Sequence, residues 1–528
     1  MEPVPDSPYL MGIDFGTESV RVGLFDAEGT PAAFHAAEVS TERPQPGWAE
    51  QDPGQWWSSL VTAVKGAMST AGIAAEEVAG ISVDATSSTV LAVDANAEPL
   101  RPAIMWMDVR AAEEADRIRA TGSPALKYNG FGPVSAEWGL PKVLWLKDHE
   151  PETWLAARHV CDCGDWVTRR LTGEWSASIN FASSKYYYDR DEGGFPEDLY
   201  VALDISELME KYPPDITDLG VQVGELRAEV ASELGLRPGT LVAQGGIDAY
   251  LGALGLGVVE PGQVALITGS SHVIIAQAAE PIHDPGFWGA YTDAMLRGRY
   301  TIEAGQASTG SVAAWFKRNL ASDAVAEAER RGVDPYEILT ERAGKVPIGS
   351  EGLLVLDYFQ GNRSPHTDPL TRGMIWGLSL HHGAGHVFRA LMEGICFGTE
   401  DILRVLRRRG FQARSIVASG GPARSDLWMQ IHADVSEVPI SLTRNSEGGP
   451  ALGAAMCAAV GAGIHPELQA AAARMVHIER TIEPDHDRHQ EYQFYMDKYV
   501  ETYERMKDPM HRMVRHLDER RADQRGTA

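Results

Sequence analysis

The chain has few cysteines and fewer basic than acidic residues, and each shortage excludes a class of protein. Its 528 residues include four cysteines, Cys161, Cys163, Cys396 and Cys457. Cys161 and Cys163 are too close for an unstrained disulfide and lack zinc-site spacing, so we expect reduced thiols in a cytoplasmic protein. Lys and Arg number 47 against 74 Asp and Glu, a net charge of −27. Such a surface repels nucleic acid and anionic lipid, so we expect neither as a partner.

Long apolar runs and low-complexity tracts are also absent. No stretch reaches about 18 uninterrupted apolar residues, so we expect no membrane span. Residues 1–6 have neither the basic nor the apolar region of a signal peptide, and we expect no secretion signal. Hydrophobic residues make up 44% of the chain, which is ordinary for a globular protein. The length favours two to four domains of about 100–200 residues each.

Two similar hairpins open the two halves of the chain. Residues 9–14 form a short apolar run, Phe15–Ser19 a polar turn, and residues 20–26 a second strand pattern. Residues 263–276 repeat this design around the tip Thr268-Gly269-Ser270-Ser271. The echo indicates two domains of related plan, although a chance likeness of two hairpins would give the same pattern.

The remaining patterns alternate between helix and strand, which predicts an α/β fold with a parallel or mixed sheet. A strand at 89–94 is expected to pair with the strand at 78–84. Residues 258–262 have the composition of a hinge, and the charged segment from Asp485 onward is expected to be a solvated helical tail that frays at its end. Helices are predicted at 55–71, 138–148, 165–171, 249–255, 386–409 and 426–435, and further strands at 239–248, 415–419 and 439–442.

The hairpin tips carry groups that phosphoryl transfer needs. Asp14 ends a strand and can hold a metal, Gly16 lets the backbone approach phosphate oxygens, and Thr17 adds a hydroxyl. Thr268 and Ser270 flank Gly269 and can surround a second face of the polyphosphate. Taken singly, each tip is also explained as an ordinary Asx turn or a serine-rich hairpin. Together they predict a nucleotide bound between two domains.

Two glycine turns complete the set. Asp248 follows Gly245-Gly246 and could accept a proton from a substrate hydroxyl, or it could cap the helix that follows. Gly420-Gly421, between a strand and a helix, offers a flat surface for a purine and ribose, with a second glycine turn at Gly448-Gly449. Neither turn is a Walker A motif.

These four motifs, in this order and spacing, resemble those of the FGGY carbohydrate kinases over about residues 9 to 480. The departure is Gly139, three residues before Lys142, where the family often has Ser, Thr or Pro, so one substrate-side contact is in doubt. Further matching segments are Gly47–Pro53 with Trp56-Trp57, Trp106–Ala111, Gly361–Pro365 with Arg372-Gly373, and Gly377-Leu378 with His386 and Glu393 beyond.

The resemblance implies two actin-like (ribonuclease H-like) ATPase domains with the nucleotide and sugar in the cleft between them. Residues 1–257 would bind the sugar, 258–480 would bind ATP, and 481–528 would form a helical tail. By resemblance, the chain transfers the γ-phosphoryl group of ATP to an alcohol. Mg²⁺ would lie near Asp14, and Asp248 would act as the general base. The phosphate and nucleotide residues would be Asp14, Gly16, Thr17, Glu18, Thr268, Gly269, Ser270, Gly420, Gly421 and Arg424.

Within the family, three segments look most like the ribulokinase branch: Asp84–Thr89, Lys185 in 182–188, and Glu303–Gln306. By this similarity, Ser87, Lys185, Asp248 and Glu303 would contact a ketopentose. Lys185 could instead be a surface lysine, Glu303 a capping or paired carboxylate, and Trp106 and Trp138 core residues rather than sugar platforms. The open alternatives are a kinase for xylulose, erythritol or a pentitol, a non-catalytic sugar or nucleotide sensor, and an actin-like or chaperone-type ATPase. A homodimer is one expectation for the assembly.

Overall fold

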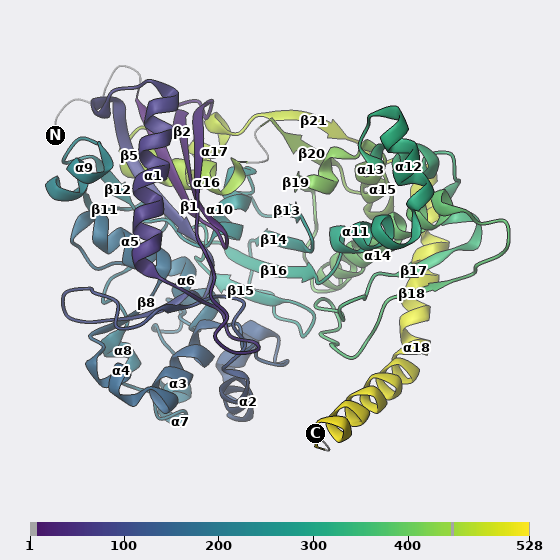
Figure 1. Cartoon of the computed structure of the whole chain (residues 1–528), viewed down its shortest axis with the longest axis horizontal. Coiled ribbons are helices and arrows are strands. Elements are labelled where there is room, and N and C mark those ends of the chain that lie inside the picture. The colour runs from purple at the N-terminus through teal and green to yellow at the C-terminus, as the bar shows by residue number, and fades with distance from the viewer. Residues whose placement is uncertain (1–7, 445–447, 527–528) are drawn as a thin grey trace.

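A computed structural model describes residues 8–444 and 448–526, with side chains through Arg520. The chain folds into two α/β halves that lie side by side, each built on a central mixed sheet (Figure 1). The α/β class and the two-part plan expected from the sequence are confirmed. The four cysteines are all buried and unpaired. Among the described residues, no helix has the length and apolar character that crossing a membrane requires.

The first sheet has six strands in the order β11-β12-β5-β1-β2-β3. β1 pairs antiparallel with β2 through the predicted hairpin and parallel with β5 on its other side. β1 and β5 are buried along nearly their whole length, as expected for central parallel strands covered on both faces. The bounds are β1 Tyr9–Phe15, β2 Ser19–Asp26, β3 Pro31–Glu38, β5 Val78–Ala85, β11 Gln222–Glu225 and β12 Leu241–Ala243.

The second sheet repeats this plan in the order β15-β16-β14-β13-β19-β20-β21. β13 pairs antiparallel with β14 and parallel with β19, as β1 pairs with β2 and β5. The match continues outward, with β16 in the place of β3, and β20 and β21 in the places of β12 and β11. A match over five strand pairs confirms two domains of related plan. The bounds are β13 Gln263–Thr268, β14 His272–Ala278, β15 Trp288–Thr292, β16 Tyr300–Gln306, β19 Ser415–Gly420, β20 Ile440–Thr443 and β21 Ile478–Ile482.

Two helices each pack against a sheet of the opposite half. α16 (Gly449–Gly461) follows the second hairpin in sequence but packs on β1 and β5 of the first sheet, while α10 (Asp248–Gly255) contacts β13 and β14. The two helices also pack against each other, and a Cβ atom on Gly453 would lie 1.9 Å from the carbonyl oxygen of Leu251. Glycine therefore sets how closely the halves approach.

The helices begin and end at residues suited to those positions. In α1 (Pro53–Ala71), Asp52 accepts a hydrogen bond from the Gly54 N–H, and Gly72 ends the helix at φ 66°. The other helices are α2 Ala112–Ala120, α3 Gly139–His149, α4 Pro151–Ala156, α5 Cys163–Thr172, α6 Ile179–Lys185, α7 Glu197–Ala202, α8 Leu208–Lys211, α9 Ala228–Leu234, α11 Gly310–Leu320, α12 Ser322–Arg331, α13 Pro335–Ala343, α14 Ala384–Arg408, α15 Asp426–Ser436, α17 Leu468–Met475 and α18 His486–Gly526.

The predicted pairing of the strand at 89–94 with the strand at 78–84 is wrong. β6 (Val90–Val93) belongs to a separate sheet of order β4-β7-β6-β8. Ser88 adopts a left-handed conformation at φ 57°, and this turn takes the chain out of the first sheet. The bounds of the other elements are β4 Glu50–Gln51, β7 Ala103–Ile104, β8 His159–Asp162, β9 Ala177–Ser178, β10 Ile216–Thr217, β17 Leu354–Leu356 and β18 Met374–Trp376.

The expected C-terminal segment is helical, but the expectation that it is solvated is wrong for its first turns. The first turns of α18 bury Tyr492, Met496, Tyr499 and Tyr503 in the second core, while its last turns project away from both halves (Figure 1). The division into 1–257, 258–480 and 481–528 stays a prediction. β21 spans its last boundary, and α18 ties the final segment to the second half.

Candidate active site

A cavity of about 600 Å³ is lined by residues of both halves. It contains the ends of the two hairpins, the start of α10 and the start of α16. Six of the predicted site residues line it: Thr17, Ser87, Lys185, Asp248, Glu303 and Gly420. The structure thus brings together residues that are up to about 400 positions apart in the sequence.

The other predicted residues do not line the cavity, although they are close in sequence to residues that do. They belong to the two hairpin tips and the turn after β19, whose neighbours Thr17, Ser271 and Gly420 do reach it. Asp14 is 2% exposed and Thr268 is 3% exposed, so both are buried. Their roles toward a nucleotide stay predictions. This set is Asp14, Gly16, Glu18, Thr268, Gly269, Ser270, Gly421 and Arg424.

Hydrogen bonds fix the first hairpin tip. The Gly16 N–H donates to the Ser19 carbonyl at 3.0 Å, which closes the turn. The indole N–H of Trp106 donates to Thr17 Oγ1 at 2.9 Å, and Gln51 donates to the Thr17 carbonyl at 2.7 Å. The Thr17 hydroxyl is therefore held at the cavity wall, where it could donate a hydrogen bond to an acceptor in the cavity.

The second tip is joined to the turn after β19, which contains Gly420 and Gly421. The Thr268 hydroxyl donates to the Ser419 carbonyl at 2.5 Å. Gly420 has φ 94°, and a Cβ atom at this position would lie 1.7 Å from the Thr268 carbonyl oxygen. Only glycine fits there, so the second hairpin tip and the turn after β19 pack in direct contact.

Three carboxylates meet below the first tip. Asp84 and Asp14 are cross-strand neighbours on β5 and β1, and Arg21 faces Asp14 from β2. Arg21 forms an ion pair with Asp14 at 2.5 Å. Asp84 is fully buried, and within the described residues its two carboxylate oxygens and Oδ1 of Asp14 accept no hydrogen bond. Asp248 completes the group from the start of α10.

Burial raises the pKa of all three carboxyls, and neighbouring carboxylates raise it further for Asp84 and Asp248. For Asp248, burial followed by the charge of Asp14 raises the pKa to about 7. Burial raises the pKa of Asp14, although the Arg21 guanidinium opposes it. Asp84 has a pKa well above its usual range because of burial, Asp14 and Asp248. A carboxyl with a pKa near neutrality is suited to accept and release a proton at physiological pH. Asp248 is not the N-cap of α10, because Ile247 occupies that position.

Lys185, Glu303 and Tyr250 form a connected polar group in the cavity wall. Lys185 Nζ lies 3.0 Å from Glu303 Oε2, and the Tyr250 hydroxyl donates to the same oxygen at 3.0 Å. The Lys185 ammonium lies 5.0 Å from the ring centre of Trp138 and 5.1 Å from that of Trp288. Lys185 is buried, so its interpretation as a surface lysine is wrong. Glu303 is a paired carboxylate that also lines the cavity.

A buried lysine hydrogen-bonds to backbone carbonyl groups beside the cavity. Lys142 is fully buried, and its ammonium donates to the carbonyl oxygens of Ser88, Met105 and Trp106 at 2.9, 2.7 and 2.9 Å. Three N–H groups thus meet three acceptors. The departure at Gly139 has a steric reason, because a Cβ atom there would lie 2.5 Å from the Tyr186 ring.

Several of these residues were not predicted as site residues. Arg21 and Asp84 could have been found from register alone, because pairing of the first hairpin places residue 21 opposite Asp14, and β5 places Asp84 beside it. Trp288 follows an irregular loop, and no sequence pattern identified it. Lys142 had been noted only beside Gly139.

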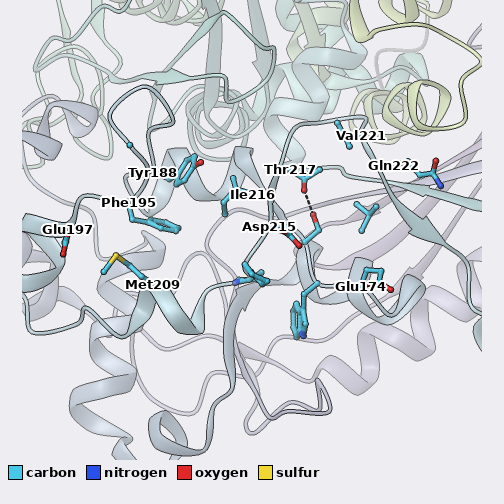
Figure 2. A pocket seen from close by; sticks show the side chains of 17 residues that line it. Glu174, Tyr188, Phe195, Glu197, Met209, Asp215, Ile216, Thr217, Val221 and Gln222 are labelled. Carbon is cyan, nitrogen blue, oxygen red and sulfur yellow. Dashed lines mark hydrogen bonds between the residues drawn. The ribbon is translucent and has the colours of Figure 1, made fainter.

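A second hollow of about 920 Å³ lies elsewhere in the first half and shares no lining residue with the cavity. Figure 2 shows Tyr188, Phe195 and Met209 at one end, Gln222 at the other, and Thr217 between them, where it accepts a hydrogen bond from Ser176. None of the predicted site residues lines it.

Comparisons with known proteins agree with this geometry. A ribulokinase of Shouchella clausii is 33% identical over 535 residues, covering 94% of this chain and 95% of that protein. A xylulose kinase of Staphylococcus epidermidis is 28% identical, covering 94% and 97%. The crystal structure of xylulose kinase from Rhodospirillum rubrum superposes with a TM-score of 0.85 at 29% identity, covering 95% of this chain and 100% of that one.

Two family models match most of the two halves that form the cavity. The N-terminal domain of the FGGY family of carbohydrate kinases matches residues 9–255, and its C-terminal domain matches residues 264–462. Kinases of this family use ATP. The chain belongs to the FGGY family of carbohydrate kinases and is a phosphotransferase whose acceptor is an alcohol group.

Proposed function

We propose that this kinase phosphorylates a ketopentose of the ribulose type at its terminal hydroxyl. The observation that carries the proposal is the polar group of Lys185, Glu303 and Tyr250 in the same cavity as Asp248. A polyol site needs such buried donors and acceptors, because an unmatched sugar hydroxyl or an unpaired protein group weakens binding strongly. The relatives named ribulokinase, at 31–34% identity, favour ribulose over other ketoses.

Asp248 is the proposed general base. A sugar hydroxyl is a weak nucleophile at neutral pH, and a carboxylate within hydrogen-bond reach can take its proton as the bond to phosphorus forms. Asp248 lies at the cavity wall with a pKa raised to about 7 by burial and by Asp14. The proton moves from the sugar hydroxyl to the Asp248 carboxylate, and the γ-phosphoryl group moves from ATP to the sugar oxygen.

The carboxylates fit a magnesium ion. Buried acidic oxygens without a partner are costly unless a cation or a proton compensates them. Asp14 Oδ1 and both oxygens of Asp84 are in this state within the described residues, and carboxylate oxygens are the ligands Mg²⁺ prefers. We infer that Asp14, with Asp84 and Asp248 beside it, would hold the ion. When bound, Mg²⁺ would neutralise charge on the phosphates of ATP.

ATP would bridge the two halves. Thr17 and the first tip would donate to phosphate oxygens from one side, and Thr268, Gly269 and Ser270 from the other. The glycines after β19 and at the start of α16 leave room for the purine and ribose, since Gly420, Gly449 and Pro450 line the cavity. Closing the halves around both substrates would exclude water and suppress wasteful ATP hydrolysis.

A substrate panel tests the proposal. ADP release should be measured with both enantiomers of ribulose and of xylulose, with hexuloses, erythritol, glycerol and pentitols, and the product of the best substrate identified. We expect the highest kcat/KM for a ribulose enantiomer. A kcat/KM for xylulose or a polyol far above that for either ribulose would reject the ribulose assignment and leave the kinase intact.

The same assay separates the other functional classes. An ATPase with protein partners would release ADP at a rate that ignores every sugar, and a sensor would release none. We expect ADP release that depends on the sugar, because Asp248 and both hairpin tips meet in one cavity with the sugar-side residues.

A further inference from the structure

A cluster of histidines lies outside the cavity described above. Glu351 lies in the turn Ile348–Gly352 just before β17, and His381 and His386 lie in the loop after β18 and the first turn of α14. β17 and β18 pair in antiparallel register, with Leu354 opposite Trp376, which brings the two loops side by side. None of these three side chains lines the active-site cavity.

We propose that Glu351, His381 and His386 bind one Zn²⁺ ion on the surface of the second half. Oε2 of Glu351 lies 2.5 Å from His381 Nε2 and 3.5 Å from His386 Nε2. All three ligand atoms lie within 4.8 Å of one another, and among the described residues no other group of three such side chains does so. Tetrahedral zinc with bonds of about 2.1 Å needs ligand atoms about 3.4 Å apart, so small side-chain rotations suffice.

The donor set suits zinc. Two imidazole nitrogens and a carboxylate oxygen are the protein ligands of many sites that keep a water as the fourth ligand. The side chains of His381, Glu351 and His386 are 68%, 39% and 20% exposed, so water can complete the coordination. Within the described residues, the ion pairs of Glu351 are both with these imidazoles.

The backbone at Glu351 is strained, and a buried carboxylate stabilises it by hydrogen bonds. Four consecutive residues have positive φ angles: 73° at Gly349, 51° at Ser350, 53° at Glu351 and 95° at Gly352. This left-handed conformation is unfavourable for residues other than glycine. The buried Glu393 holds this turn by accepting from the Gly349 N–H at 3.1 Å and the Ser350 hydroxyl at 2.9 Å. The turn fixes where the Glu351 carboxylate projects, and such preorganisation is typical of a binding site.

Zinc binding would change one hydrogen bond. His386 Nδ1 accepts the Gly383 N–H at 3.1 Å, so without metal the neutral ring carries its proton on Nε2. Zinc on Nε2 would move that proton to Nδ1 and end the bond to Gly383. Because binding includes this cost and uses only three protein ligands, we expect a micromolar Kd.

His382 supplies a matched control in the same loop. Its Nδ1 accepts the Ser379 N–H at 3.0 Å, and its Nε2 faces the carbonyl oxygen of Glu351 at 3.3 Å rather than the carboxylate. It is therefore a partly exposed histidine of the same loop that is not one of the three ligands.

The test is titration calorimetry of the full chain with zinc chloride, without nucleotide, magnesium or sugar. We expect one zinc per chain, binding weakened at least about tenfold in His381→Asn and Glu351→Gln, and binding within about threefold of wild type in His382→Asn. Thermal melts of the same variants should show that zinc raises Tm in wild type and His382→Asn but not in His381→Asn.

Two outcomes would overturn the proposal. One is a wild-type chain that binds no zinc at concentrations well above micromolar. The other is zinc binding that survives in both His381→Asn and Glu351→Gln. In that case His486→Asn would show whether the ion sits instead beside Glu437, whose carboxylate lies 2.7 Å from His486 and 3.4 Å from His489. Kinase activity takes no part in this test, so its result is independent of the proposed function.

Discussion

At the scale of the single residue, Asp248 combines burial, a neighbouring negative charge and access to the cavity. Asp248→Asn keeps the shape of the side chain but removes the proton acceptor. We expect kcat to fall by about 10²–10⁴-fold, the range typical of a general base, with nucleotide affinity close to wild type. Steady-state kinetics and nucleotide titration would check this, and normal turnover would remove Asp248 as the base.

The raised pKa of Asp248 also predicts a pH dependence. The base acts in its ionised form, so activity is lost as pH falls through its pKa, which is about 7 in the free protein. A bound Mg²⁺ would lower that value. The profile of kcat/KM against pH should therefore show an acid limb with an apparent pKa at or below about 7. A profile flat down to the ordinary pKa of an exposed aspartate, about 4, would contradict the assignment.

Lys142 gives a third prediction at this scale. Replacing it by Met leaves three buried carbonyl oxygens of the cavity wall without donors. We expect a loss of about 1–3 kcal/mol of stability and a rise of about tenfold in the sugar KM with a smaller change for ATP, since Ser88 and Trp106 line the cavity. Lys147→Met on the same helix α3, whose lysine pairs at the surface with Glu207, is the control. Equal KM changes for both substrates would indicate a purely structural role.

At the scale of the element, Gly420 joins β19 to the second hairpin tip. Gly420→Ala should lower stability by at least about 2 kcal/mol, because φ is 94° and the new Cβ would overlap the Thr268 carbonyl oxygen. Gly421→Ala is the matched control, since nothing lies within 4 Å of a Cβ there. Denaturant melts compare the two, and equal effects would show that the turn adapts.

Local patterns predicted those elements that carry a strong signal of their own. The hairpins at β1–β2 and β13–β14 follow from apolar runs broken by polar tips, and α1 follows from apolar residues at helical spacing. Pairing partners carry no such signal. The left-handed turn at Ser88 directs the chain away from the first sheet, so β6 pairs elsewhere. α18 buries several tyrosines, although the many charged residues around them in the sequence predicted an exposed helix. In the site, the motif residues were found, whereas Asp84 and Trp288 depend on which strands lie side by side.

At the scale of the whole molecule, the two halves are joined where the chemistry is proposed to occur. α10 and α16 cross between the sheets, and both begin at the cavity with Asp248 and Gly449. The Lys185–Glu303 ion pair also links an element of the first half to a strand of the second. Because both substrates would touch both halves, binding of one should favour closure around the other.

The most direct test of the account is a crystal structure with a ketopentose and a non-hydrolysable ATP analogue. We expect the acceptor hydroxyl within about 2.6–3.2 Å of the Asp248 carboxylate, the γ-phosphate between the tips that contain Thr17 and Thr268, and the sugar against Lys185 and Glu303. A sugar bound outside this cavity, or an Asp248 carboxylate turned away from the acceptor hydroxyl, would contradict the account.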